Sequence, residues 1–464
     1  MKKLIFLVLL LVYCPFIILS QVEDNPGTGL NFNDEQYGKV PRKAPLTRSL
    51  YGTSLPSSAS LKSYAPTPLS QGSYGTCVGW SSTFCALTII YAKANGWSDK
   101  ATIDANTFSP GFVYSQIKNT SDVNCTYGTY IPDALDLLKT KGAPKYSEMD
   151  ISCPSSIPLD VFNKAQKNTI SDYAKLFDTY DLESIKIQAV KKSLSEGKPV
   201  VIGMKCPTSF NTAKGSWSPT EDPAGEFGGH AMCVIGYDDN QYGGAFEIQN
   251  SWGTWWGNQG YIWIKYDDFQ NWVKYAYELI DIPKKTNVNA SDLAGAIKLV
   301  ESSGNAMDAK YIGTHYKMNS AYRSGTKFRI YISNNEPAFV YAFGTDATNK
   351  VFPIFPYQPG ISPALNYKKN DVAIPDEDHY IEMDNTEGTD YMCVLYSLKP
   401  LNFDQIQSKV EKTGGTFEAR IKAAVGTDLV DKQNIKFDAS TVSFSAKSQG
   451  KSVVALIIET KHVK

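Results

Sequence analysis

The chain has 464 residues, more than one hydrophobic core usually serves, so we expect at least two domains. Hydrophobic residues make up 42% of the sequence and charged residues 20%, which is typical of globular protein and excludes a disordered or fibrous chain. The 46 Lys and Arg residues nearly balance the 47 Asp and Glu residues, so no positive excess indicates a nucleic acid or an anionic membrane as partner.

Residues 1–20 have the pattern of a secretory signal peptide: a basic start, an apolar run from Leu4 to Leu19, and the small residue Ser20. A retained membrane anchor is the alternative, and the run is short for a bilayer span. We therefore predict a protein that is secreted or reaches the periplasm or the cell surface. Of the eight cysteines, Cys14 would leave with the signal, so at least one remaining thiol would be unpaired.

Residues 21–59 are rich in Asn, Pro, Gly and Ser and predict a flexible leader without a core of its own. Helix and strand patterns then alternate over residues 60–286. Helices are predicted from Cys77, over Pro132–Lys139 and over Leu182–Ser195. Strands are predicted over Pro199–Met204, Ala231–Tyr237, Ala245–Gln249 and Tyr261–Tyr266. The first half of this region should be helical and the second half rich in sheet.

Residues 287–464 show a different pattern and predict a second, β-sandwich-like domain. Apolar and mostly polar side chains alternate over Lys327–Ile332, as in a strand with one buried face. Strands are predicted over Lys327–Ser333, Ala338–Phe343, Val351–Phe355, Asp390–Ser397 and Ser452–Glu459, and a helix over Ile406–Leu429. His315, His379 and His462 are scattered, and no catalytic set is expected in this region.

Three residues of the first region form a possible catalytic set. Cys77 follows a Gly-bearing loop at a predicted helix start, where unsatisfied N–H groups would stabilise a thiolate and lower its pKa. His230 is the only histidine before His315, so it is the one candidate base. Asn250 follows a predicted strand, and its amide can accept the imidazole N–H and fix the tautomer. The competing interpretation is a structural cysteine or half of a disulfide.

The order Gln71, Cys77, His230, Asn250, with Trp252 in an Asn-Ser-Trp-Gly motif, resembles the papain-like cysteine peptidase family over residues 60–286. The resemblance implies an α+β fold with a helical lobe and a β-rich lobe, no cofactor or metal, and peptide or protein substrates rather than nucleic acid. It further implies a bacterial exported member of the family.

Roles for individual residues are also implied by this resemblance. Gln71 would help to bind the oxyanion, Trp252 would cover the bond between histidine and asparagine, and Gly128 would bind substrate backbone. Three positions depart from the family pattern, because Tyr74 stands where a cysteine is usual, Val78 where an aromatic residue is usual, and Thr129 where a second glycine is usual after Gly128. A large inhibitory propeptide is missing, so how premature activity is restrained stays open.

Two further features concern cysteines and the second domain. Cys125 and Cys153 lie in loop-like surroundings and could form a disulfide, whereas Cys85 is expected in the core. The segment Phe352–Pro356 resembles a functionally uncharacterised β-rich domain of bacterial exported proteins. We expect this domain to bind a protein or a cell-surface component.

Two classes of function are compatible with the sequence. The chain could be a secreted cysteine peptidase that works through a thioacyl-enzyme, or a catalytically inactive papain-like shell that binds partners through its C-terminal domain. The complete set of Gln71, Cys77, His230 and Asn250 favours the enzyme. A transglutaminase-like or amidase activity is disfavoured, because such sites more often use a carboxylate or a second histidine in place of Asn250.

Overall fold

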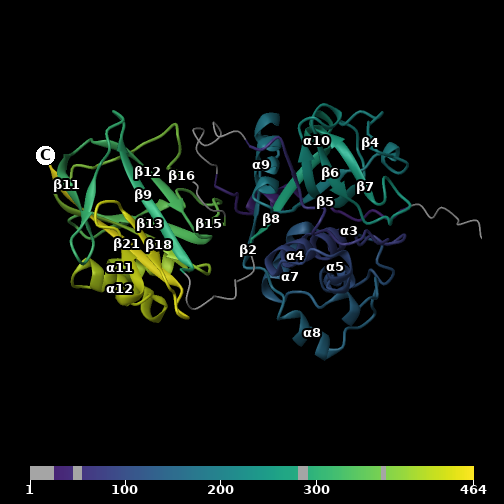
Figure 1. Ribbon diagram of the computed structural model, residues 1–464, viewed down its shortest axis with the longest axis horizontal. Helices are drawn as coiled ribbons and strands as arrows, with labels where there is room; N and C mark the ends of the chain where they lie inside the picture. Colours follow the sequence, from purple (N-terminus) through teal and green to yellow (C-terminus); the bar gives the residue numbers. More distant parts are fainter. Residues whose placement is uncertain (1–25, 45–54, 281–290, 367–371) are drawn as a thin grey trace, which may run out of the picture.

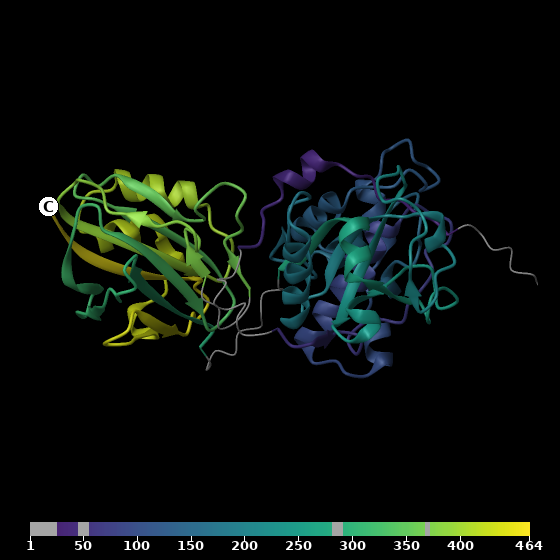
Figure 2. The same cartoon turned by 90° about the horizontal axis from the view of Figure 1, so that it is seen from above.

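The computed structural model describes residues 26–44, 55–280, 291–366 and 372–464, and the predicted signal peptide, residues 1–20, lies outside them. Two domains lie side by side (Figures 1 and 2), an N-terminal domain of residues 55–280 and a C-terminal domain of residues 291–464. Within the described ranges, no helix combines the length and apolar character needed to cross a membrane.

The first half of the N-terminal domain is a helical lobe. Its central helical rod joins α3 (Cys77–Gly79), η1 (Trp80–Leu87) and α4 (Thr88–Asn95), and it ends at Gly96, which adopts a left-handed φ of 67°. The helix predicted from Cys77 is confirmed, and Phe84, Leu87 and Ile90 of this rod are buried. Around it lie α5 (Lys100–Ala105), α6 (Pro110–Ile117), α7 (Ile131–Thr140) and α8 (Leu159–Ala165).

The second half is a β lobe built on one eight-stranded sheet, with the order β2-β8-β3-β5-β6-β7-β4 and β1 paired to β5. The strands are β1 (Ser58–Ser60), β2 (Asp172–Lys175), β3 (Val200–Lys205), β4 (Ser216–Trp217), β5 (Gly229–Asp238), β6 (Ala245–Gln249), β7 (Tyr261–Lys265) and β8 (Val273–Ile280), with helices α9 (Glu183–Ser195) and α10 (Tyr266–Trp272). One apolar core joins both lobes, and the predicted two-lobed α+β architecture is confirmed.

The C-terminal domain is a β-sandwich, as predicted. Its seven-stranded sheet contains β10 (Ala309–Tyr311), β11 (Tyr316–Arg323), β21 (Val453–Val463), β18 (Gly388–Ser397), β13 (Ala338–Thr345), β14 (Val351–Phe355) and β15 (Ala364–Leu365). Its six-stranded sheet contains β16 (Val372–Ile374), β12 (Lys327–Asn334), β9 (Leu293–Glu301), β20 (Ser443–Ala446), β19 (Ile435–Phe437) and β17 (Ile381–Glu382). Five of these strands, β12, β13, β14, β18 and β21, correspond to the predicted ones.

The seven-stranded sheet is buried on both faces. In β13, Val340 and Ala342 face the sandwich core, whereas Phe339, Tyr341 and Phe343 face a second apolar cluster beneath two helices. These helices are α11 (Phe403–Lys412) and α12 (Phe417–Val425). The single helix predicted over Ile406–Leu429 is therefore wrong, because Gly414 and Gly415 interrupt it.

The segment before the N-terminal domain, residues 26–44, is packed against both domains. It contains the short helix α1 (Asp34–Lys39), whose Tyr37 is buried and stacks on Tyr275 with ring centroids 4.4 Å apart. The prediction of a flexible leader over residues 21–59 is wrong for residues 26–44, and also for Ser58 and its neighbours in β1. The polar, glycine-containing composition hid the few apolar side chains that dock the segment.

Helix α12 provides a test of how the C-terminal domain is stabilised. Ile421 is 1% exposed in the cluster between the helices and the sheet, so Ile421→Ala should lower the free energy of unfolding of this domain by about 2–4 kcal/mol. The exposed neighbour Lys422 gives the control Lys422→Ala. Far-UV circular dichroism during denaturant unfolding is the measurement, and equal midpoints for the two variants would contradict the packing described.

Candidate active site

Cys77, His230 and Asn250 come together where the helical lobe meets the β lobe. Cys77 begins the central helical rod, His230 is the second residue of β5, and Asn250 follows β6. Strands β5 and β6 are antiparallel neighbours, which places the histidine and asparagine close together. The backbone N–H of Ala231 donates to Cys77 Sγ at 3.4 Å, which places the sulfur beside His230. The structure thus assembles the three residues from distant parts of the sequence.

The orientation of the His230 ring is fixed by Asn250. Nε2 of His230 lies 2.7 Å from Asn250 Oδ1, and the same oxygen accepts the backbone N–H of Ser251 at 2.7 Å. Because the Ser251 N–H requires an acceptor, the shared atom is the oxygen, and Nε2 must carry the ring proton. Nδ1 is then the basic nitrogen, and it has no hydrogen-bond partner within the part of the chain that the structure describes.

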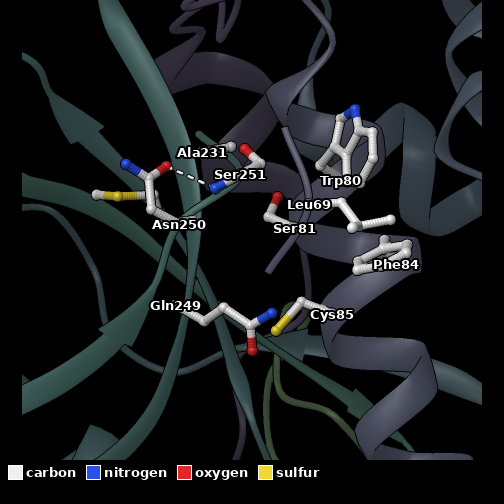
Figure 3. Close-up of a pocket in the computed structure, with 10 residues that line it drawn as sticks. Leu69, Trp80, Ser81, Phe84, Cys85, Ala231, Gln249, Asn250 and Ser251 are labelled. Atoms are coloured by element: carbon white, nitrogen blue, oxygen red, sulfur yellow. Dashed lines mark hydrogen bonds between the residues drawn. The ribbon is translucent and has the colours of Figure 1, made fainter. Parts of the chain in front are cut away.

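Asn250 and the His230 ring are held rigidly. Trp252 is 1% exposed and stacks on the imidazole, with ring centroids 4.7 Å apart, so it covers the bond between His230 and Asn250. Figure 3 shows Asn250 and Ser251 near residues of the central rod. The cavity that these residues line has a volume of about 10 Å³. Asn250 Oδ1 is thus held by the His230 ring and the Ser251 N–H beside a small cavity.

The environment of Cys77 opposes ionisation in this form of the protein. Burial raises the pKa of the thiol to about 11, and this outweighs the N–H groups of Ala231, Gly29 and Val78, which lower it. The lowered pKa expected from the helix start is therefore wrong for this form, because desolvation exceeds the effect of the helix N-terminus. Burial likewise lowers the pKa of His230 to about 4, although the hydrogen bond to Asn250 raises it. Both groups are neutral near pH 7.

Gln71 is buried beside Asn250 rather than free to move. Its Oε1 accepts the Ser251 hydroxyl at 2.6 Å, and its Nε2 donates to the carbonyl of Tyr74 at 2.7 Å. Its backbone N–H donates to Ser251 O at 2.8 Å. The side-chain amide of Gln71 therefore has a fixed orientation near the start of the central rod. One of its two Nε2 N–H groups donates to Tyr74, and the other does not.

The chain's own residues 27–31, here called the interlobe stretch, cover this site. The Trp252 indole N–H donates to the carbonyl of Gly27 at 3.0 Å, and Gly27 N–H donates to Gly72 O at 3.1 Å. A Cβ at Gly27 or at Gly29 would overlap backbone atoms of Tyr74 or of Gly75. Only glycine permits so close an approach, and the result is that Cys77 is fully buried.

Leu30 is the centre of the interlobe stretch and pairs with both lobes. Its N–H donates to Gly229 O at 3.0 Å, Asn31 N–H donates to Thr129 O at 2.9 Å, and Thr129 N–H donates to Gly29 O at 2.9 Å. The pairing is parallel with Thr129 and antiparallel with Gly229. Leu30 is 4% exposed, and its side chain fills the space above the backbone of Gly203.

The predicted substrate-binding residue Gly128 lies at this edge, in a left-handed conformation with φ 75°. Its Cα packs against the Gly29 carbonyl, whereas the neighbouring Thr129 makes the two backbone hydrogen bonds. Sequence reasoning missed Gly27, Gly29 and Leu30. The Gly-Thr-Gly pattern of residues 27–29 was the available signal, since glycines at alternate positions allow close backbone contact.

The cysteines of the helical lobe fall into two groups. Cys125 and Cys153 form a disulfide with a Cα–Cα distance of 5.9 Å, which confirms the predicted pairing. Cys85 is 4% exposed and belongs to the core, as expected. Cys77 is among the described cysteines that carry a free thiol.

Comparison with known families agrees with the geometry. Residues 71–278 match the family described as papain family cysteine protease, and this range includes Gln71, Cys77, His230 and Asn250. The N-terminal domain is therefore similar to the papain family cysteine proteases. Residues 321–400 match a domain of unknown function, DUF4384.

Individual relatives are distant. An uncharacterized peptidase C1-like protein of Acanthamoeba polyphaga mimivirus is 31% identical over 24% of this chain and 36% of that protein. Gamete and mating-type specific protein A of Dictyostelium discoideum is 27% identical over 42% of this chain and 39% of that protein. This chain thus spans less than half the length of either relative. Xylellain, a cysteine protease from Xylella fastidiosa, is a solved structure with 20% identity and a TM-score of 0.45, covering 56% of this chain and 97% of xylellain.

The neutral state of His230 predicts a pH dependence of stability. Its pKa is about 4 in the folded protein against an ordinary value of 6.5, so the unfolded chain binds a proton first as the pH falls. The stability that this histidine contributes is complete above pH 6.5 and is lost as the pH falls toward 4, by about 3 kcal/mol.

Denaturant unfolding at pH 7 and pH 4, followed by tryptophan fluorescence, measures this loss for the N-terminal domain, which contains all eight tryptophans. The variant His230→Gln is the control, because carboxylates titrate in both proteins and cancel in the difference. An identical pH dependence in the two proteins would contradict a buried neutral imidazole.

The covering of Cys77 by the interlobe stretch predicts a second result. In Gly29→Ala the new methyl group overlaps Gly75, so the stretch must leave its place, and alkylation of Cys77 by iodoacetamide should accelerate at least about tenfold. The control is Gly38→Ala, since a Cβ at Gly38 meets no neighbouring atom. Peptide mass spectrometry identifies the labelled cysteine, and equal rates in both variants would show that the stretch does not shield the thiol.

Proposed function

We propose that this chain is a cysteine peptidase that hydrolyses peptide bonds through Cys77, His230 and Asn250, and that residues 27–31 keep it latent. The observation that carries the proposal is the bond from His230 Nε2 to Asn250 Oδ1, shielded by Trp252, with Cys77 Sγ held beside the same strand. A structural cysteine would need no oriented histidine next to it.

In the proposed reaction, Cys77 transfers its proton to His230 Nδ1 and the thiolate attacks the carbonyl carbon of the substrate. His230 then donates the proton to the leaving amine, which leaves a thioacyl-enzyme that water hydrolyses with His230 as base. The Gln71 amide and the N–H groups at the start of the central rod supply donors for the oxyanion. Asn250 keeps the imidazole in the productive tautomer throughout.

The structure represents the latent form in this proposal. Cys77 and His230 are buried and neutral, and the backbone edges of Thr129 and Gly229 are occupied by Leu30. A substrate must displace residues 27–31 to reach the sulfur. Once solvent or substrate replaces them, the desolvation that raises the pKa of Cys77 is relieved, and the helix N-terminus can favour the thiolate.

The space that Leu30 fills supports a preference for substrates with an apolar side chain at the corresponding position. One of its methyl groups lies against Gly203, and apolar ring and methyl carbons of Tyr275 and Ile131 border the same space. Burial of a leucine-sized side chain there favours binding by about 1.5–3 kcal/mol. Peptides with leucine at this position should therefore be cleaved in preference to those with aspartate.

Export of the protein is also a proposal. The pattern of residues 1–20 predicts a signal peptide, and the disulfide between Cys125 and Cys153 supports an oxidising compartment, where such bonds persist. Secretion, the periplasm and the cell surface are all compatible with these observations.

Activity is tested in the variant Leu30→Asp, which buries a carboxylate in an apolar space and so favours release of residues 27–31. We expect this variant to hydrolyse a mixed peptide library. Adding Cys77→Ala or His230→Ala should reduce the rate at least about 10³-fold, since both residues act in one mechanism. Adding Cys393→Ala, which removes a buried thiol of the C-terminal domain, should leave the rate unchanged.

Absence of hydrolysis at every pH from 5 to 8, together with a Cys77 that reacts no faster than an ordinary thiol, would overturn the proposal. The chain would then be the inactive binding protein that was the alternative from its sequence.

A further inference from the structure

The end of the N-terminal segment, residues 41–44, lies between the two domains and is here called the interdomain stretch. Arg42 forms parallel bridges with Lys175 of β2 on one side and with Ile361 on the other. Toward the N-terminal domain, Lys43 N–H donates to Lys175 O and Lys175 N–H donates to Pro41 O, both at 2.9 Å. Figure 2 shows the segment passing from α1 toward the C-terminal domain.

The C-terminal domain supplies the other edge of this pairing. Arg42 N–H donates to Gly360 O at 2.6 Å, and Ser362 N–H donates to Arg42 O at 2.7 Å. The two edges of this stretch are therefore used by different domains: the N–H and C=O of Arg42 pair with the C-terminal domain, whereas Lys43 N–H and Pro41 C=O pair with the N-terminal domain. Without the C-terminal domain, the N–H and C=O of Arg42 would lose their partners.

Lys43 adds a buried ionic network that also joins both domains. Its ammonium lies 2.7 Å from Glu278 and 3.0 Å from Glu196 of the N-terminal domain. Glu278, 1% exposed, accepts the amide of Asn366 from the C-terminal domain at 2.7 Å. Burial raises the pKa of Glu278, but the charge of Lys43 and the hydrogen bonds from Lys43, Ser193 and Asn366 outweigh it and hold the pKa below its ordinary value. The carboxylate thus depends on Lys43, Ser193 and Asn366 for its hydrogen bonds.

Apolar contacts complete the interface. Ala44 is 3% exposed and belongs to the same cluster as Ile361 and Leu365 of the sandwich. Directly beside it, Ala174 of β2 and Ile280 of β8 pack into the cluster formed by the outer face of β13. The interdomain stretch therefore packs against the C-terminal domain and does not lie on an open surface.

We propose that the C-terminal domain has the function of retaining the inhibitory segment: it binds residues 41–44 and thereby keeps residues 27–31 between the lobes. This inference rests on the proposed peptidase function and assigns a role in the same chain to a domain whose family has no known function. The segment is fixed at two ends, by Leu30 between the lobes and by Arg42 between the domains, with α1 joining them. Loss of the attachment at Arg42 lowers the effective concentration of residues 27–31 at the space between the lobes.

Two variants detach the interdomain stretch without touching the catalytic residues. In Asn366→Asp a carboxylate replaces the amide that faces Glu278, so two buried like charges meet. In Ala44→Asp a charge enters the apolar cluster from the segment itself, so no residue of the C-terminal domain is changed. The matched control is Asn434→Asp, because Asn434 bonds to Gln449 within the C-terminal domain.

The measurement is the rate at which an epoxysuccinyl probe labels Cys77 in the full chain, with Gly29→Ala as the directly opened reference. We expect at least about a tenfold increase in both detaching variants and none in Asn434→Asp. If Gly29→Ala is labelled rapidly while both detaching variants match the unsubstituted chain, the proposed role of the C-terminal domain is overturned and the peptidase proposal stands. If Gly29→Ala is unreactive toward the probe although iodoacetamide labels its Cys77 rapidly, the thiol is accessible but not activated, and the proposed peptidase function itself fails.

Discussion

The backbone pairing of Leu30 with Thr129 and Gly229 is the interaction on which the observed state of this protein depends. It closes the space between the lobes, excludes water from Cys77, and leaves the thiol and the His230 imidazole without the solvation that their charged forms require. The same pairing positions Gly27 against Trp252, so the shield over the imidazole is itself bonded to the covering segment. Latency in this account arises from desolvation and coverage rather than from displaced catalytic residues.

The site can be covered and yet have its residues in position, because different parts of the structure cover the site and orient its side chains. The tautomer and orientation of His230 are set by Asn250, Ser251 and Trp252, all of which belong to the N-terminal domain. The covering residues contribute backbone contacts, the Leu30 side chain, and a hydrogen bond from the Asn31 side-chain amide to the Tyr127 carbonyl. Removal of the segment would therefore expose an assembled site. In the proposed function, the energetic barrier to activity is the detachment of Leu30, α1 and the interdomain stretch.

The motifs around Cys77, His230 and Asn250 predicted their proximity and the two-lobed fold through their resemblance to the papain-like family, and the separated strand patterns predicted the sandwich. It did not predict that Gly29 and Leu30 cover the site, since backbone pairing leaves almost no trace in side-chain composition. The raised pKa of Cys77 was also missed, because it depends on tertiary burial rather than on the helix start beside it. Gly414 was a sequence signal that the helix predicted over Ile406–Leu429 is interrupted, but apolar residues at helical spacing continue after it.

The central claim is that the chain's own backbone occupies the site between the lobes, and amide hydrogen exchange of residues 27–31 in the full-length chain tests it most directly. The account predicts that the amides of Leu30 and Asn31, which donate to Gly229 and Thr129, exchange as slowly as those in the middle of β5. Exchange of both amides at the rate of an unstructured peptide would contradict it.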